Sequence, residues 1–151
     1  MQLSPKGPFP FKGKGEPGNW RLKTLRHQFD QSREALNEIE RTMLNLVDQF
    51  EQTFTSPIAA YLVLHKTGSS KYLRWRMWGS QQSYFSVCQN ERGAQFLASL
   101  SAPVRQVILD YEQQRIRLNL LHGIYQYETK SLKRFVTDQR DLNKLIHQTA
   151  N

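Results

Sequence analysis

Four side chains that could contact a polyanion alternate along one short stretch near the middle of the chain. In segment 72–78, YLRWRMW, they occupy every second position as Tyr72, Arg74, Arg76 and Trp78. Side chains two residues apart share one face of a β-strand. A guanidinium binds phosphate with a planar fork, and an aromatic ring stacks on an unpaired base. The segment therefore predicts a strand face suited to a single-stranded or distorted nucleic acid.

The intervening side chains fall on the other face of the same strand. Leu73, Trp75 and Met77 are expected in the core, Trp75 included, because its neighbours on that face are apolar. For Arg74 and Arg76 an alternative stays open. Their stems could pack over tryptophan and tyrosine, or their charges could pair with carboxylates of a helix. The direction in which these two guanidinium groups point decides between the interpretations.

Basic charge gathers in the same part of the chain. The 151 residues include 21 Lys and Arg against 13 Asp and Glu, a net charge of +8, and residues 55–90 contain no acidic residue at all. A basic module of this kind makes nucleic acid a plausible partner. Less specific phosphate contacts are expected from four lysines, two near the strand and two in the N-terminal arm: Lys66, Lys71, Lys12 and Lys14.

Residue patterns for catalysis or metal binding are missing from the sequence. His27, His65, His122 and His147 are scattered, with no pair four residues apart and no cysteine at ligand spacing. Cys88 is the only cysteine and has no histidine near it in the sequence. We therefore expect no metal, no cofactor and no enzymatic activity. A lone cysteine and the lack of an apolar run of about 20 residues favour a cytoplasmic protein without a membrane span.

Two long segments with helical periodicity flank the central strand. Between residues 22 and 54, apolar side chains recur three and four residues apart with one lapse at Ser32, which is typical of a helix packed lengthwise on another helix. Asn19 suits the N-cap, and Pro57 prevents the helix from continuing. The pattern predicts a helix over 19–55.

The second helical region follows the central module. Asn90 is expected to cap a short helix over 91–100, and Pro103 suits the first turn of a long helix over 102–147. Positions from 104 to 146 again alternate by three and four, mostly apolar. Two such seams most simply form an antiparallel pair, although the seams alone leave open whether they close within one chain or between two.

Polar residues in the long helix are expected to have structural roles. Arg115 lies three residues after Glu112, a spacing at which the two charges pair on a helix surface. Glu128 falls on the predicted seam and is expected to be a paired carboxylate rather than a catalytic one. Asn119 beside the seam is expected to cap or bridge backbone groups.

Residues 58–88 change to a period of two and predict a three-stranded antiparallel sheet. Turn-forming residues at 66–70 and 79–82 separate three alternating runs, and Tyr84 in the third run should lie near the arginine face. The fold class is therefore α+β, a long antiparallel helical pair with a small three-stranded antiparallel sheet inserted between the helices. Residues 1–18 form a basic arm rich in proline and glycine, and 19–151 a single domain.

Three segments resemble a family of proteins carried by proteobacterial integrative and conjugative elements, some of which are labelled integrase regulators. The segments are 11–20 (FKGKGEPGNW), 72–76 (YLRWR) and 111–119 (YEQQRIRLN), in the order in which the family has them. The resemblance implies a cytoplasmic accessory protein of mobile-element DNA maintenance or transfer. It supplies no active site.

The sequence thus leads to two functional expectations. The first is a non-enzymatic nucleic-acid-binding accessory protein of a mobile genetic element, which contacts DNA through the arginine and aromatic face. The second is an adaptor that uses its helical seams or exposed aromatic side chains to bind another component of the DNA-processing machinery, or a second copy of itself.

Overall fold

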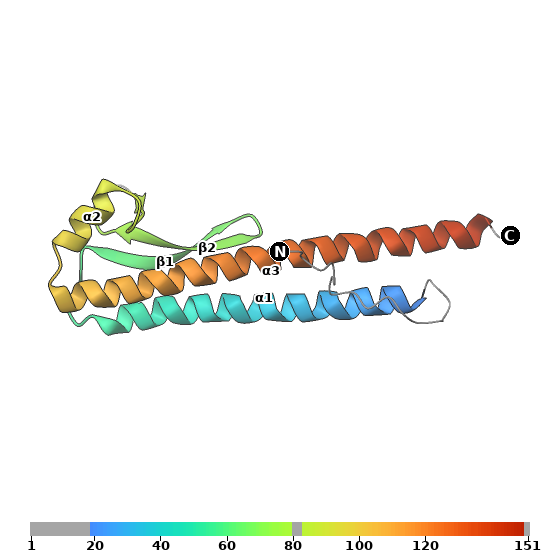
Figure 1. The fold of residues 1–151 in the computed structure, drawn as a ribbon, viewed down its shortest axis with the longest axis horizontal. Helices are drawn as coiled ribbons and strands as arrows, with labels where there is room; N and C mark the ends of the chain where they lie inside the picture. Colours follow the sequence, from blue (N-terminus) through green and yellow to red (C-terminus); the bar gives the residue numbers. More distant parts are fainter. Residues whose placement is uncertain (1–18, 80–82, 150–151) are drawn as a thin grey trace, which may run out of the picture.

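The computed structural model describes residues 19–79 and 83–149. Along the chain it contains α1 (Asn19–Thr53), β1 (Ala60–Thr67), β2 (Ser70–Met77), β3 (Tyr84–Phe85), α2 (Glu91–Ala98) and α3 (Ala102–Thr149). The predicted mixed architecture is confirmed: the sheet comes between α1 and α3 in the sequence, and the two long helices pack along each other (Figure 1).

The two long helices run in opposite directions, as their contacts show. Ser32 on α1 hydrogen-bonds Thr129 on α3 at 2.9 Å between the hydroxyl oxygens, whereas Thr53, at the other end of α1, hydrogen-bonds Tyr111 at 2.7 Å. Ser32, the lapse in the apolar seam, is therefore a buried polar contact between the helices. Because α3 has 48 residues and α1 has 35, the C-terminal end of α3 extends beyond α1 (Figure 1).

The strands form one antiparallel sheet in the order β1-β2-β3. In this register Leu62 faces Trp75 and Tyr61 faces Arg76, while Tyr84 of β3 faces Arg76 from the other side. One face of the sheet, here called the inner face, packs on the helical pair. The other, the outer face, carries Tyr72, Arg74, Arg76, Trp78 and Tyr84.

The core lies between the inner face and the two long helices. Trp75 is 1% exposed and sits edge-on against Phe50 of α1, with ring centroids 5.2 Å apart. Leu73 is fully buried, and Phe85 and Phe96 close the end of the core next to α2. The expectation that Trp75 belongs to the core is confirmed.

Polar side chains of α3 hold the open edge of β2. Because β3 is only two residues long, no strand of the described chain pairs with the backbone of Leu73 on that side. The amide of Asn119 takes the place of a strand: Oδ1 accepts from Leu73 N at 2.8 Å, and Nδ2 donates to Leu73 O at 3.0 Å. Further along α3, Gln126 Nε2 donates to Ser69 O at 2.7 Å. The predicted bridging role of Asn119 is confirmed.

The predicted seam of α3 is partly wrong. Its apolar members Leu118 and Leu132 are buried, but Glu128, Phe135 and Leu142 are exposed. The error has a physical cause: α3 must pack against both α1 and the sheet, and much of its contact with the sheet is made by polar residues that a count of apolar positions ignores. The expectation that Glu128 is a paired carboxylate on the seam is not met, since it is exposed and forms no ion pair with another described residue.

Helix and strand boundaries differ only slightly from the predicted ones. The first helix ends at Thr53 rather than 55, α2 ends at Ala98 rather than 100, and α3 reaches Thr149 rather than 147. The Asn90 cap is confirmed, since its Oδ1 accepts from Gly93 N at 2.9 Å. The third strand is much shorter than its alternating run. The predicted arm, residues 1–18, lies outside the described residues.

Candidate nucleic-acid interface

The outer face brings together the four side chains that the alternation predicted. Tyr72 and Trp78 are 38% and 62% exposed, Arg74 is exposed, and Arg76 is half-buried. Tyr84 joins them from β3 and is 36% exposed. Strand pairing fixes this arrangement, because residues 72, 74 and 76 all point away from the side on which Leu73 and Trp75 are buried.

Tyr84 organises the two arginines. Its ring centroid lies 5.1 Å from Cζ of Arg74 and 5.6 Å from Cζ of Arg76. Both guanidinium groups are therefore within cation–π distance of one ring. The Tyr84 hydroxyl is 2.9 Å from Nδ1 of His65, and Nε2 of His65 is 2.9 Å from the hydroxyl of Thr67. These contacts hold the ring in place, which positions the arginines before any ligand arrives.

The described part of the outer face carries no negative charge. Among the described residues, neither Arg74 nor Arg76 forms an ion pair, whereas other basic side chains such as Lys71 and Arg115 do. Of the two alternatives left open by the sequence, stacking on tyrosine is present, and pairing with a helix carboxylate is not found within 19–79 and 83–149. The guanidinium N–H groups are therefore not occupied by a carboxylate of the described chain.

A third arginine, Arg115, lies on the opposite side of the sheet. Unlike Arg74 and Arg76, it is paired with a carboxylate of the described chain. Its Nε donates to Oε2 of Glu112 at 2.6 Å, and the same oxygen accepts from Trp75 Nε1 at 2.7 Å. The predicted pairing of Arg115 with Glu112 is confirmed. Burial by itself raises the pKa of Glu112, but the hydrogen bonds from Arg115 and Trp75 and the charge of Arg115 outweigh burial, and its pKa is lowered.

Cys88 contacts the same carboxylate from the surface. Its Sγ lies 3.5 Å from Oε1 of Glu112, although the residue as a whole is exposed. Partial burial together with the charge of Glu112 raises the pKa of the thiol. A raised pKa keeps the sulfur protonated, which makes it a poor nucleophile.

Lys71 and Lys66 do not share the outer face with the arginines. Both lie on the inner face, where Lys66 of β1 is paired with Lys71 of β2. Lys71 forms an ion pair with Glu40 of α1, whose other oxygen is 3.2 Å from Nε2 of the buried His122. Lys71 therefore lies on the other side of the sheet from Arg74 and Arg76, since an odd position falls on the other side of a strand of period two.

Glu40 thus joins three elements through one carboxylate. Burial raises its pKa, but the hydrogen bonds from Lys71 and His122 and their charges outweigh burial, so the pKa of Glu40 is lowered. Lys66 remains exposed beside this cluster and lines a hollow of about 380 Å³ together with Arg41 and Leu44 of α1. Lys66 is therefore accessible, but on another side of the molecule from Arg74.

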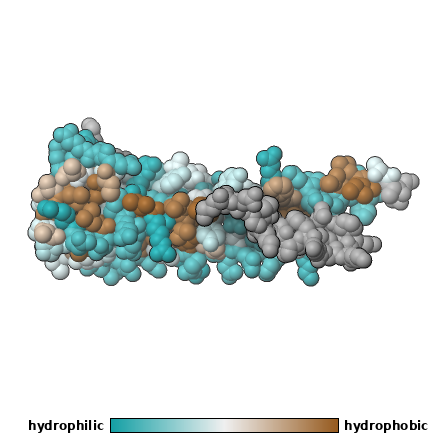
Figure 2. All heavy atoms as spheres, viewed as in Figure 1, coloured by the Kyte–Doolittle hydropathy of each residue, from teal (hydrophilic) through white to brown (hydrophobic). Residues whose placement is uncertain are grey.

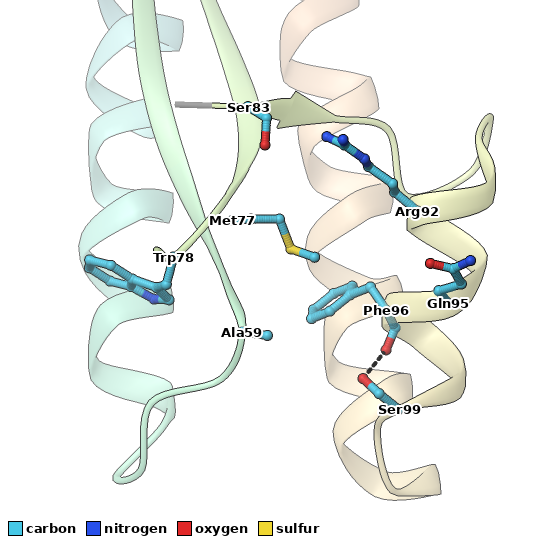
Figure 3. Close-up of a pocket in the computed structure, with 8 residues that line it drawn as sticks. All are labelled: Ala59, Met77, Trp78, Ser83, Arg92, Gln95, Phe96 and Ser99. Atoms are coloured by element: carbon cyan, nitrogen blue, oxygen red, sulfur yellow. Dashed lines mark hydrogen bonds between the residues drawn. The ribbon is translucent and has the colours of Figure 1, made fainter. Parts of the chain in front are cut away.

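A second hollow lies at the end of β2, on the side of Met77 and therefore opposite to the outer face. It has a volume of about 490 Å³ and lies between the end of β2 and α2. Figure 3 shows Met77 and Phe96 pointing toward one another across it, with Arg92 extending from α2 on the side of Ser83. Sequence reasoning missed Arg92 and Gln95, because single polar residues on a short exposed helix carry no periodic signal.

Trp78 is among the residues that line this hollow, but its ring extends away from Phe96. In Figure 3 its ring extends to the other side of the strand from Phe96, and it packs on Tyr61 with ring centroids 4.3 Å apart. Trp78 therefore lies at the end of the outer face, where its ring packs on the ring of Tyr61. Its exposure leaves part of the indole open to solvent.

The remaining predictions concern the arm, metal binding and membranes. Lys12 and Lys14 lie outside the described residues. Within residues 19–79 and 83–149, no group of three or more His, Cys, Asp or Glu side chains could hold a metal ion. None of the helices in the described part of the chain has both the length and the apolar character that crossing a membrane requires.

Comparisons of the chain with models of protein families, with curated proteins and with solved structures give no match. The function must therefore be inferred from the site itself, which consists of two stacked arginines, three exposed aromatic rings and no opposing carboxylate among the described residues.

Proposed function

We propose that this protein is a non-enzymatic nucleic-acid-binding accessory protein of a mobile genetic element, which contacts DNA through its outer face. One observation carries the proposal: Arg74 and Arg76 are held side by side on an open sheet face by Tyr84, without a carboxylate partner among the described residues. Two positioned guanidinium groups next to aromatic rings match the two parts of a nucleotide, its phosphate and its base.

The distribution of charge supports the same ligand. The net charge is +8, and residues 55–90 contain no acidic side chain. On the inner side, Lys71 and Arg115 are neutralised by Glu40 and Glu112. The outer face therefore keeps two positive charges that no described neighbour neutralises, and a polyanion would be attracted there. The assignment to a mobile element rests on the resemblance of three short sequence segments.

The proposal is tested by nucleic-acid binding at several salt concentrations. A labelled oligonucleotide titrated with the protein should bind more weakly as salt rises, because each phosphate contact releases a counterion. The double variant Arg74→Ala, Arg76→Ala should lose at least about tenfold in affinity, and its salt dependence should decrease by about two phosphate contacts. Fluorescence anisotropy measures both quantities.

A matched control separates the site from net charge. The double variant Arg33→Ala, Arg134→Ala also removes two positive charges, from exposed arginines of α1 and α3 that pair with Asp30 and Asp138. It should change affinity by less than about threefold, an effect of general electrostatics. Equal losses in the two double variants, or no binding at low salt by the parent protein, would refute the outer face as a nucleic-acid site.

The adaptor remains the second candidate, for a different reason from the one that the sequence offered. The predicted apolar seam of α1 is used within the chain, but α3 exposes large apolar side chains, both outside its predicted seam and, at positions such as Phe135 and Leu142, on it. Figure 2 shows apolar surface near the C-terminal end of α3. The exposed residues are Leu109, Ile116, Leu120, Ile124, Tyr127, Phe135, Leu142, Leu145 and Ile146.

Self-association offers a direct test of this second candidate. If the exposed side of α3 binds a helix of another protein or of a second copy, the parent chain should associate as its concentration rises. The variant Leu120→Ser, Ile124→Ser should then stay monomeric in sedimentation velocity experiments. That outcome together with absence of oligonucleotide binding would favour the adaptor over the nucleic-acid-binding protein.

A further inference from the structure

The helix α3 has apolar side chains on two sides. Ile108, Leu118 and Leu132 are buried against the rest of the molecule, whereas the nine large apolar side chains named above, from Leu109 to Ile146, are 37–77% exposed. These nine side chains are here called the α3 stripe. A helix that is apolar on more than one side is normally covered on each of them. The described part of the chain covers only the side of Leu118.

The α3 stripe faces neither α1 nor the sheet. Asn119 binds the backbone of β2, and Thr129 binds Ser32 of α1. Ser131 lies between Tyr127 and Phe135 of the stripe. Because successive residues of an α-helix are turned by about 100°, Ser131 points about 160° away from Thr129 and about 120° away from Asn119. A partner bound to the stripe would therefore leave the helical pair and the outer face of the sheet as they are.

The length of the α3 stripe indicates what kind of partner fits it. From Leu109 to Ile146 it spans about 55 Å at about 1.5 Å per residue, and a helix is about 10 Å across. A second helix along the whole stripe would therefore cover roughly 550 Å² on each partner, or about 1,100 Å² in total. A specific interface needs at least about 1,000 Å². A long helix fits this requirement, and a short one would fall below it.

The positions within the stripe fit a second copy of α3 that runs in the opposite direction. In a symmetric antiparallel pair, each residue is level with the residue of the other copy that lies equally far beyond the symmetry axis. With the axis at Ser131, six of the nine stripe residues are level with another stripe residue: Ile116 with Ile146, Leu120 with Leu142, and Tyr127 with Phe135.

Two further observations favour a second α3 helix. Ser131 is small, so two helices that meet there can approach closely between the tyrosine and phenylalanine rings on either side. The other long helix offers no comparable face, because Leu44 is the only exposed large apolar side chain in the described part of α1.

We propose that the α3 stripe is the interface of a symmetric antiparallel dimer of this protein, in which the α3 helices of two copies meet at Ser131. The proposal names the partner that the second candidate function leaves open. It does not depend on nucleic-acid binding, because the outer face of each copy stays uncovered in this arrangement.

A disulfide at the symmetry axis tests the arrangement. In the variant Ser131→Cys, Cys88→Ser, each copy has one thiol at the axis, so mild oxidation should link most of the protein into covalent dimers. The matched control is Gln113→Cys, Cys88→Ser. Residues 113 and 131 are about five helical turns apart and share one side of α3, but residue 113 would lie about 54 Å from its counterpart. Non-reducing electrophoresis should show at least about fivefold fewer covalent dimers for the control, since a disulfide needs Cα atoms within about 7 Å.

Opposite charges test which residues are level with each other. Leu120→Lys or Leu142→Glu alone places a charge against leucine, so each should weaken dimerisation at least about tenfold in sedimentation velocity experiments. Both changes in one chain bring opposite charges together across the interface, and this double variant should associate at least about tenfold more tightly than either single variant. Leu44→Lys, at a leucine of α1 that is also about half exposed, should associate as the parent does.

Each outcome decides for or against the dimer. A chain that stays monomeric at about 100 μM, above the micromolar Kd that a weak specific interface has, would overturn it. Equal cross-linking at positions 113 and 131, or a double charge variant no better than the single variants, would overturn the antiparallel arrangement. Oligonucleotide binding by the Arg74→Ala, Arg76→Ala variant is measured separately, so failure of the dimer and failure of the proposed function are distinguishable.

Discussion

Both sides of the sheet carry basic side chains next to aromatic rings, but the two sides differ in whether a carboxylate pairs with these basic side chains. On the inner side, Arg115 and Trp75 share one buried carboxylate, Glu112, and Lys71 is paired with Glu40. On the outer face, Arg74 and Arg76 stack on a tyrosine, and no described carboxylate pairs with them. An arginine next to an aromatic ring is thus part of the core on one side and a solvent-facing cation on the other.

The difference shows that residue type does not by itself mark a site. Burying a charge without a partner is costly, so Arg115 and Lys71, which are partly buried on the inner side, each come with an acid, whereas Lys66 on that side is exposed. A cation exposed to water needs none, and its N–H groups remain available to a ligand. The environment of an arginine on an open face is therefore more informative than its presence in the sequence.

The largest effect is expected where the inner side loses its acid. Replacement Glu112→Ala leaves the Arg115 guanidinium and the Trp75 indole N–H without their acceptor in a site where Glu112 is 2% exposed. The free energy of unfolding should fall by about 3 kcal/mol, as urea denaturation would measure. The exposed pair Arg41 and Glu38 is the control, since Glu38→Ala should cost less than about 1 kcal/mol. Similar losses would contradict the contrast between buried and exposed pairs.

Acid should weaken the same contacts without a mutation. The pKa values of Glu112 and Glu40 are lowered in the folded protein from an ordinary value of 4.5. Groups with a lowered pKa stabilise the fold fully above their unfolded value, and this contribution is lost as the pH falls through the folded value. Unfolding free energies measured from neutral pH down through this acidic range should therefore fall.

The variant Glu112→Gln isolates the contribution of one group. It retains the shape of the side chain but cannot titrate, so the acid-induced loss of stability should be shallower than in the parent protein. Parallel curves for parent and variant would show that Glu112 does not have a lowered pKa.

A smaller effect is expected at the edge of β2. Asn119→Ala removes both of its hydrogen bonds to the Leu73 backbone and leaves Leu73 N without an acceptor, while Leu73 O keeps only a 3.3 Å hydrogen bond from Arg115. The loss of unfolding free energy should be about 1–2 kcal/mol. Faster hydrogen exchange of the Leu73 amide should accompany it. The variant Gln113→Ala, at an exposed position on the same helix, should have neither effect.

The smallest effect on stability is expected on the outer face. Arg74→Ala with Arg76→Ala removes only stacking on Tyr84 and Tyr72, so the free energy of unfolding should change by less than about 1 kcal/mol. The same urea denaturation measures this change. A loss as large as that of Glu112→Ala would mean that these arginines hold the fold together and would remove the contrast between the two sides.

The outer face could be predicted because strand geometry is a simple rule. Alternation placed Tyr72, Arg74 and Arg76 together and put Trp75 in the core, and the same rule would have excluded Lys71.

The hollow could not be found in this way. Arg92 and Met77 come from elements whose packing depends on Phe85 and Phe96 meeting in the core. The contacts of α3 with the edge of β2 were only partly visible, since an amide such as that of Asn119, which replaces a missing strand, has no periodic signature.

The sequence by itself determined two long helices, a small antiparallel sheet and the division of β2 into an apolar and a basic face. These features follow from local repeats of seven and two residues, which backbone geometry converts directly into faces. Tertiary structure alone decided which cations are neutralised by carboxylates far away in the chain, whereas the i,i+3 pair of Glu112 and Arg115 could be predicted. Ion pairs such as Lys71 with Glu40 join residues that are distant in the chain, and no local pattern records which of them will meet.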